Sequence, residues 1–244
     1  GGIPYREGVF STWNDPAKFG LFYHAALMTR RGEVKEAQNT VFIKPKDLKN
    51  WNLDTAAVQV EKSKIVACFD ENAQIQNQVE QANNVGEVRS DTGELYRSWE
   101  KNIGYIDTPM TKCAYGYLGR NKKAELSGVT INGLTDFAVV ALSSLSDKPI
   151  TESDNILLTT VGRAENTGSR FAGEFMLDYG TSPVLIEVIE TEVEINTQVT
   201  GLSVWAVNAE GFYIGKLPSQ YQNGCFRFRT GSTSRSIYYL IVKE

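Results

Sequence analysis

The chain has 244 residues, with 25 Lys and Arg against 29 Asp and Glu, and its formal net charge is -4. That balance gives no strong field for steering onto nucleic acid or anionic lipid, so neither is an expected partner. His24 is the only histidine, which excludes His-rich metal sites and any triad that needs a histidine elsewhere. The 11 Tyr, 11 Phe and 21 Gly are typical of a β protein with many turns.

The first long element is a helix predicted over residues 16–31. An Asn-Asp pair before Pro16 is a common helix start, and Gly32 follows the last turn as a C-cap glycine. Phe19, Phe22 and their neighbours make this helix apolar over more than half its circumference. We therefore expect it to pack against a large surface.

After residue 40 the hydrophobic period changes from about 3.6 to 2, which indicates strands. The polar stretch 71–86 is expected to form a surface loop or a weak helix, and Asp91 to Gly93 predict a hairpin turn. The expected strands fall in two series, first 40–44, 87–99, 105–109, 114–118, 125–133, 136–145 and 155–164, then 184–197, 202–218, 224–231 and 236–244.

This order predicts a mainly β fold, an antiparallel β-sandwich of jelly-roll or immunoglobulin-like type with one N-terminal helix and a second small β unit. We divide the chain into a helix-containing segment (1–50), the sandwich (51–180) and the small C-terminal β unit (181–244). The last part is either a unit of its own or a sheet added to the first.

The three cysteines, Cys68, Cys113 and Cys225, follow no CxxC spacing and lie beside apolar or aromatic residues. Buried, inert thiols are expected, and a single disulfide among them stays open. No apolar run reaches the length of a membrane span, and the first residues contain no signal-peptide core. An export signal for a secreted protein would therefore lie upstream.

Catalytic motifs are absent: the sequence contains no GxSxG, no phosphate-binding P-loop, no GxGxxG and no HExxH. Of the common catalytic arrangements, a pair of carboxylates, as used in glycoside hydrolysis, is the one that the sequence still allows. Glu187, Glu190, Glu192 and Glu194 look clustered, but the last three alternate along a strand and indicate a solvated acidic stripe. No catalytic residue is assigned, and no cofactor is expected.

Secreted β-sandwiches often hold a structural calcium ion through loop carboxylates. The loops with Asp147, Glu152 and Asp154 supply such groups. An ordinary surface loop is the simpler interpretation.

Sugar binding requires flat aromatic rings with polar groups at their edges. Trp99 has polar and charged neighbours and is expected to be the most exposed ring. Tyr96 is three residues away, so the two rings share a face only if the strand bulges. Tyr115 and Tyr117 are two apart and are expected on one face of a strand. We assign these four rings as candidate carbohydrate-binding residues, although core packing competes for each. Further candidates are Tyr105, Trp205 and Tyr213, with Trp205 expected in the core.

The runs YIDTPMTKCAYGYLG, ELSGVTI and FAVVALSSLSDKPITESDNILLTTVGRAENTG cover residues 105–119, 125–131 and 137–168. They resemble the β region after the TIM barrel in large bacterial glycoside hydrolases. Residues 10–37 resemble the end of such a barrel, and 183–244 resemble the small terminal β unit. Met110 and Lys112 replace the Arg and Gln of the family pattern, so no ligand role is assigned to that turn.

The resemblance implies that the catalytic carboxylates lie on barrel strands upstream of this chain, which would then be a non-catalytic part of a secreted enzyme. Two polar residues of the VGRAENTG run, Arg163 and Glu165, are expected to form a buried ion pair that pins a loop.

The leading hypothesis is a carbohydrate-binding module that holds the linked catalytic domain on a plant cell-wall polysaccharide of β-glucan type. The alternative is a structural domain that buttresses the barrel, binds no sugar, and exposes an apolar patch around Phe19, Leu21 and Phe22. A complete enzyme with two carboxylates on a sandwich is the third and weakest hypothesis. Buried rings favour the buttress, and a coplanar exposed group favours sugar binding.

Overall fold

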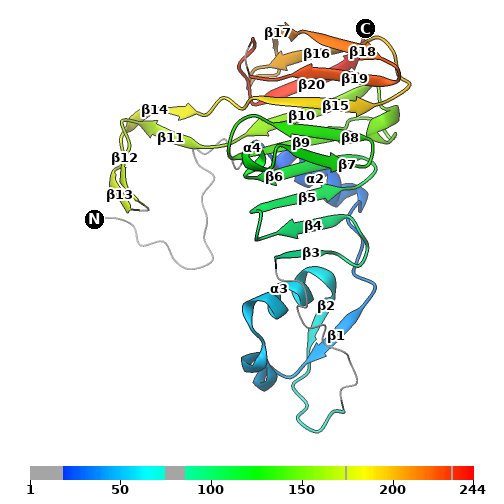
Figure 1. Ribbon diagram of the computed structural model, residues 1–244, viewed down its shortest axis with the longest axis vertical. Coiled ribbons are helices and arrows are strands. Elements are labelled where there is room, and N and C mark those ends of the chain that lie inside the picture. The colour runs from blue at the N-terminus through cyan, green and yellow to red at the C-terminus, as the bar shows by residue number, and fades with distance from the viewer. Residues whose placement is uncertain (1–18, 75–85, 174, 232) are drawn as a thin grey trace.

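The computed structural model describes residues 19–74, 86–173, 175–231 and 233–244. Two antiparallel sheets form the body of the molecule (Figure 1). The larger has nine strands in the order β17 (Tyr213–Leu217), β16 (Leu202–Val207), β20 (Tyr238–Lys243), β10 (Asn155–Val161), β9 (Ala138–Ser144), β6 (Thr111–Gly116), β5 (Ile103–Asp107), β4 (Leu95–Ser98) and β3 (Glu87–Arg89). The smaller has five strands in the order β18 (Ser219–Gln222), β19 (Cys225–Arg229), β15 (Thr191–Asn196), β8 (Val129–Gly133) and β7 (Lys123–Leu126).

The hydrophobic core lies between these two sheets. Val140 and Leu142 of β9 face Ile131 of β8, Val193 of β15 and Phe226 of β19 within one cluster of buried side chains. In strand β15, every second residue is buried and the residues between them are exposed or half-buried, as in a strand with one covered face. The prediction of a mainly β, sandwich-like fold is therefore confirmed.

Strands from the two predicted β ranges lie side by side in both sheets. β20 pairs with β10 on one side and with β16 on the other, and β15 lies between β8 and β19. The predicted boundary near residue 181 thus separates strands that share hydrogen bonds and one core.

The N-terminal helix α2 (Phe22–Arg31) ends where the sequence predicts. Gly32 has a φ of 59° and donates its N–H to the carbonyls of Met28 and Thr29, so it is the left-handed C-cap. The predicted start at Pro16 lies outside the described residues.

A second helix, α3 (Leu53–Lys62), was not predicted. Its N-cap is Asn52, whose side chain accepts a hydrogen bond from the Thr55 N–H. It packs against β3 at the end of the nine-stranded sheet (Figure 1). The short elements nearby are β1 (Thr40–Ile43), the 3-10 helix η1 (Pro45–Asn50) and β2 (Lys64–Ala67), with α4 (Leu118–Asn121) and η2 (Ile150–Glu152) further along.

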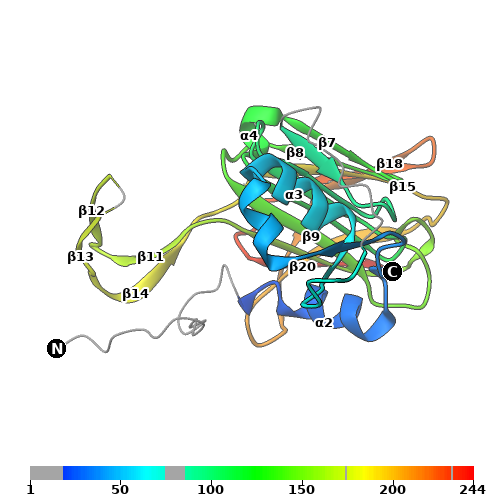
Figure 2. The same cartoon turned by 90° about the horizontal axis from the view of Figure 1, so that it is seen from below.

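A long hairpin projects sideways from the sandwich after β10 (Figures 1 and 2). At its base β11 (Ala164–Thr167) pairs with β14 (Thr181–Ile186), and at its tip β12 (Arg170–Ala172) pairs with β13 (Phe175–Asp178). We call residues 163–188 the β-arm. No helix among the described residues is both long enough and apolar enough to cross a membrane.

Candidate functional site

Helix α2 lies on the outer face of the nine-stranded sheet and is attached there by His24 (Figure 2). Ser143 of β9 and Thr159 of β10 alternate with core residues, so their hydroxyls point away from the core. The His24 ring bonds both, with Nδ1 2.8 Å from Ser143 Oγ and Nε2 2.7 Å from Thr159 Oγ1. One buried imidazole therefore joins the helix to two adjacent strands.

Burial sets the charge state of His24. Its side chain is buried among hydroxyl groups, and this desolvation lowers its pKa from 6.5 to about 4. A neutral imidazole donates one hydrogen bond and accepts the other, which suits two hydroxyl partners. The contacts that attach α2 to the sheet therefore favour the neutral form of His24.

The rest of α2 leaves large apolar side chains in solvent. Phe19, Phe22 and Tyr23 are all exposed, and Tyr23 has 62% of its surface accessible. Tyr23 touches the sandwich only edge-on, with its ring centroid 6.0 Å from that of Tyr238. The patch that the buttress hypothesis expects around Phe19, Leu21 and Phe22 is present, although Leu21 is itself partly buried.

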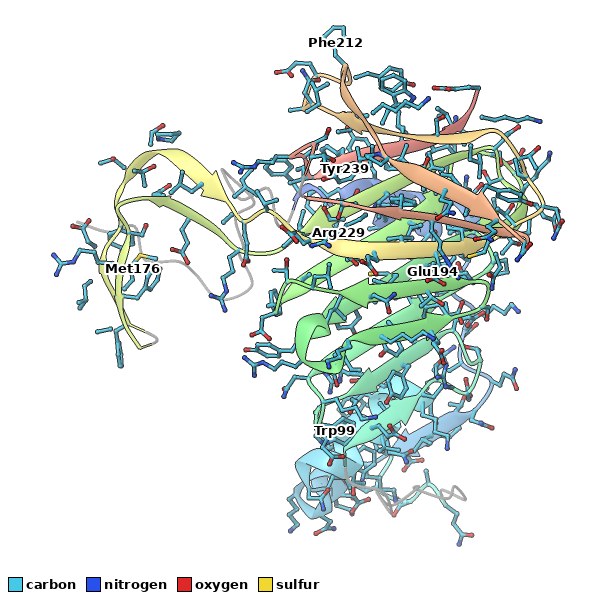
Figure 3. The ribbon with its side chains drawn as sticks, turned by 45° about the horizontal axis from the view of Figure 1, so that its top comes forward. Trp99, Met176, Glu194, Phe212, Arg229 and Tyr239 are labelled. Carbon is cyan, nitrogen blue, oxygen red and sulfur yellow. The ribbon has the colours of Figure 1, made fainter. Side chains whose placement is uncertain are left out.

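The hairpin between β16 and β17 carries a second exposed apolar group, Phe212, Tyr213 and Ile214. Val207, the last residue of β16, pairs with Tyr238, which in turn pairs with Thr159 near the end of β10. The hairpin tip, which Figure 3 marks with Phe212, therefore lies at the same end of the sheet as the start of α2. The turn was predicted, but the exposure of these side chains was not.

The β-arm begins at this same end, directly after β10. Its strands bury almost nothing, because every described residue of β12 and β13 is exposed. The exposed large side chains of the arm and its base are Phe171, Phe175, Met176, Leu177, Tyr179, Leu185, Ile186 and Val188.

Three groups of exposed apolar side chains, on α2, on the β16–β17 hairpin and on the β-arm, therefore lie toward one end of the nine-stranded sheet. We call Phe19, Phe22, Tyr23, Phe212, Tyr213 and Ile214 the corner surface, and the β-arm projects beside it (Figure 2). Single exposed apolar side chains are normal, but groups of large exposed ones are a feature of interaction sites. This surface was expected from the sequence only for the α2 residues.

The four candidate sugar-binding rings do not form one platform. Tyr96 lies opposite Tyr105 on the core-side face of β4 and β5, where the rings stack with centroids 5.2 Å apart. Burial and the hydrogen bond to Glu87 raise the pKa of Tyr96 to about 12. Tyr115 lies on the other face of the sheet and covers Gly104 of the neighbouring strand.

Tyr117 and Trp99 each have surroundings of their own, apart from Tyr96 and Tyr115. Strand β6 ends at Gly116, which has a φ of 109°, so the strand alternation does not extend to Tyr117. The Tyr117 ring instead packs edge-on against Phe137 and under the Arg120 guanidinium, 3.9 Å from the ring centroid. Trp99 was expected to be the most exposed ring, but it is partly buried.

Trp205 was expected in the core, and this is wrong. Val204 and Ala206 are fully buried, so the alternation places Trp205 on the outer face. Its ring is partly buried beside Tyr213, with centroids 5.3 Å apart and 30° between the ring planes. Its indole N–H donates to Glu244 at 3.1 Å, and Lys216 Nζ lies 5.4 Å from the ring centroid.

Polar groups singled out in the sequence have ordinary surroundings. Arg163 and Glu165 are both exposed, so the expected buried ion pair is wrong: the β-arm has no second layer to bury it. Asp147, Glu152 and Asp154 are exposed as well. Within the described ranges, no three His, Cys, Asp or Glu side chains come together to hold a metal ion.

The acidic stripe on β15 faces solvent, as expected, but arginines of β19 neutralise it. Arg227 Nε lies 3.3 Å from Glu194 Oε1, and an Arg229 nitrogen lies 2.5 Å from Glu190 Oε2. Glu194, Arg227 and Arg229 line a shallow groove of about 340 Å³ on the five-stranded sheet.

All three cysteines are free thiols. Burial raises the pKa of the Cys113 thiol to about 12, which makes it inert as predicted. Cys68 and Cys225 are only partly buried.

No protein-family model matches this chain, and neither a curated protein nor a solved structure matches it.

Proposed function

We propose that this chain is a non-catalytic docking domain that binds a folded domain of the same polypeptide through the corner surface and the β-arm. The observation that carries the proposal is the presence of three groups of exposed apolar side chains, on α2, on the β16–β17 hairpin and on the β-arm, toward the same end of the nine-stranded sheet. Each contributes exposed aromatic or aliphatic side chains there, which a neighbouring apolar surface would cover.

The resemblance of residues 10–37 to the end of a barrel supports a covalently linked partner. Phe19, which belongs to the corner surface, lies within that stretch. A linked partner is present at high effective concentration, and a modest apolar contact is then sufficient for binding. With the resemblance of residues 10–37 to a barrel end, the partner proposed is the catalytic barrel of a glycoside hydrolase.

The test compares the isolated chain with the intact polypeptide by calorimetry. The double variant Phe22→Ser, Phe212→Ser should leave the unfolding temperature of the isolated chain unchanged, because both side chains are already exposed. In the intact polypeptide it should lower the unfolding temperature of the preceding domain. Leu145→Ser is the matched control, since Leu145 is exposed beyond β9 at the opposite end of the sheet.

An unchanged calorimetric profile of the intact double variant would reject the docking proposal. A loss of stability in the isolated chain would also reject it, because these side chains would then act within the sandwich itself.

Polysaccharide binding is the second candidate, and the Trp205–Tyr213 pair favours it. Two neighbouring rings lie on the outer face with Lys216 and Glu244 at their edges, which is the mixture of flat and polar groups that sugars need. Affinity electrophoresis through gels of xyloglucan, β-glucan, xylan, mannan or galactan tests it. Retardation that Trp205→Ala removes and Trp99→Ala leaves unchanged would establish this site, whereas equal mobility in every gel would eliminate soluble glycans as ligands.

A further inference from the structure

Helix α2 is held on the sheet by one buried side chain. Of its 10 residues only His24 is buried, and its ring lies between the hydroxyls of Ser143 and Thr159. A helix of this length is marginally stable by itself in water and normally depends on a packed apolar face. The position of α2 therefore depends on the contacts of His24 more than on hydrophobic packing.

The C-terminal end of the helix has further anchors. Arg31 donates a hydrogen bond to the carbonyl of Ser146 at 3.2 Å, and the Thr108 hydroxyl donates to Glu33 Oε2 at 2.5 Å. These contacts hold residues 31–33 on the body of the molecule without His24.

The N-terminal end has weaker contacts. The N-cap residue Leu21 makes no side-chain cap hydrogen bond. Tyr23 meets Tyr238 only edge-on, at a centroid distance of 6.0 Å. Loss of the His24 contacts would therefore free this end of the helix while the other end stays held.

The sheet beneath His24 supplies no opposite charge. The outward positions of β9 and β10 nearest to the ring are uncharged, namely Ala141, Ser143, Leu157 and Thr159. On the strands beside them, Cys113 of β6 pairs with Ala141, and Tyr238 of β20 pairs with Thr159. Burial raises the pKa of both Cys113 and Tyr238, so both are neutral in acid.

The charged groups of the helix segment are engaged elsewhere. Arg30 is exposed, and Arg31 Nη1 lies 3.4 Å from Glu33 Oε1 at the C-terminal end. A protonated His24 ring in its present site would thus be a buried cation with hydroxyl partners alone. Water solvates that cation better, and the ring reaches water when the helix leaves the sheet.

We propose that α2 is an acid-released strap, in which protonation of His24 frees the N-terminal end of the helix and the helix swings about its anchored C-terminal end while the sandwich stays folded. The inference goes beyond the docking function and does not depend on it. Phe19, Phe22 and Tyr23 move with the helix, so three of the six residues of the corner surface leave their place in acid.

The direction of the effect follows from linkage. The pKa of His24 is lowered from 6.5 to about 4 in the attached state, so protonation favours detachment. The attachment has its full strength above pH 6.5 and weakens as the pH falls toward 4. The ratio of detached to attached helix is expected to be about 30-fold larger at pH 5 than at pH 7.5.

An NMR titration of the chain from pH 7.5 to 4 tests the strap. His24 is the only histidine, so the C2–H signal of its ring reports protonation without ambiguity. Nuclear Overhauser contacts between the rings of Tyr23 and Tyr238 report attachment of the helix. Contacts between the methyl groups of Leu142 and Leu158, which pair across β9 and β10, report the folded sandwich.

The strap predicts that the tyrosine contact is lost with the same midpoint as the His24 titration, while the leucine contact persists. His24→Gln keeps a donor and an acceptor but carries no charge, so its tyrosine contact should be the same at every pH. Glu33→Gln is the matched control at the C-terminal anchor and should respond to pH as the unmodified chain does.

Protonation of His24 with the tyrosine contact intact would overturn the strap. Loss of the tyrosine and leucine contacts in one step would overturn it as well, because acid would then unfold the whole sandwich. A pH response that persists in His24→Gln, or disappears in Glu33→Gln, would reject His24 as the trigger. Should His24→Gln detach the helix at every pH, the two midpoints in the unmodified chain decide: equal midpoints support the strap, and different ones reject it.

Discussion

The sandwich and the β-arm are built from the same kind of strand but have opposite relations to water. In the sandwich, alternation along β9 and β15 places one set of side chains in a core where Leu142 and Val193 are 0% exposed. In the arm, the paired strands β12 and β13 bury almost nothing. Hydrogen bonds between strands therefore do not make a core, which requires a second layer that the arm lacks.

This difference identifies the arm as the part of the molecule whose apolar side chains have no covering layer within the described residues. The sandwich satisfies its apolar residues internally, whereas the arm and the corner surface do not. Substitutions of matched side chains in the two regions test this distinction, because they compare the resulting changes in the free energy of unfolding.

The largest expected effect is in the core. Leu142→Ala should lower the free energy of unfolding of the isolated chain by about 2–5 kcal/mol, because it opens a cavity at a fully buried site. Leu177→Ala, the same change in the arm, should stay within about 0.5 kcal/mol. Urea denaturation measures both. A comparable loss for Leu177→Ala would show that the arm is packed in the isolated chain, against the structure.

Next in size is the pH dependence of the link between α2 and the sandwich. The pKa of His24 is lowered from 6.5 to about 4, so folding favours the neutral ring. The resulting stability is complete above pH 6.5 and is lost as pH falls toward 4, by about 3 kcal/mol in total. His24→Gln should remove this dependence, and denaturation at a series of pH values in both proteins measures it. Equal pH profiles would contradict a buried neutral His24.

A smaller loss is expected at Gly104, which Tyr115 covers. A Cβ at this position would lie 2.1 Å from Tyr115 Cζ, so Gly104→Ala forces the ring to move. We expect a loss of about 1–3 kcal/mol in the free energy of unfolding. In a Tyr115→Leu background the same change should cost less. Equal costs in both backgrounds, measured in a double-mutant cycle, would mean that Tyr115 is a free ring available to a ligand.

The smallest effect is expected on the charged face of the five-stranded sheet. Glu194→Gln removes the pair with Arg227, which is exposed to solvent, and should change the free energy of unfolding by less than about 0.5 kcal/mol. Thermal denaturation at low and high salt measures it. A large, salt-insensitive loss would mean that this face is covered in the folded chain.

Much of the sandwich could be predicted because its strands have one covered face. Apolar and polar residues therefore alternate in the sequence with a period of two. Helix α3 was not predicted, since its Ala- and Val-rich sequence reads equally as a strand, although Asn52 before Thr55 is a capping signal. Trp205 was misplaced because its apolar neighbours belong to the opposite face, and only the register with β20 shows this.

The candidate site was less predictable for a physical reason. A local sequence indicates which residues are apolar but not whether a second layer covers them. Phe19 and Phe22 could be proposed as exposed only on the hypothesis of a missing partner. The exposure of Phe212 and of the β-arm depends on where distant strands bring these segments together, and adjacent residues do not contain that information.

The most direct test of the docking account is hydrogen–deuterium exchange on the isolated chain and on the intact polypeptide. The account predicts that amides of α2, of residues 208–214 and of the β-arm exchange rapidly in the isolated chain and slowly in the intact polypeptide. The core strands β9, β10 and β15 should exchange equally slowly in both. Identical exchange of α2, the hairpin and the arm in the two proteins would contradict it.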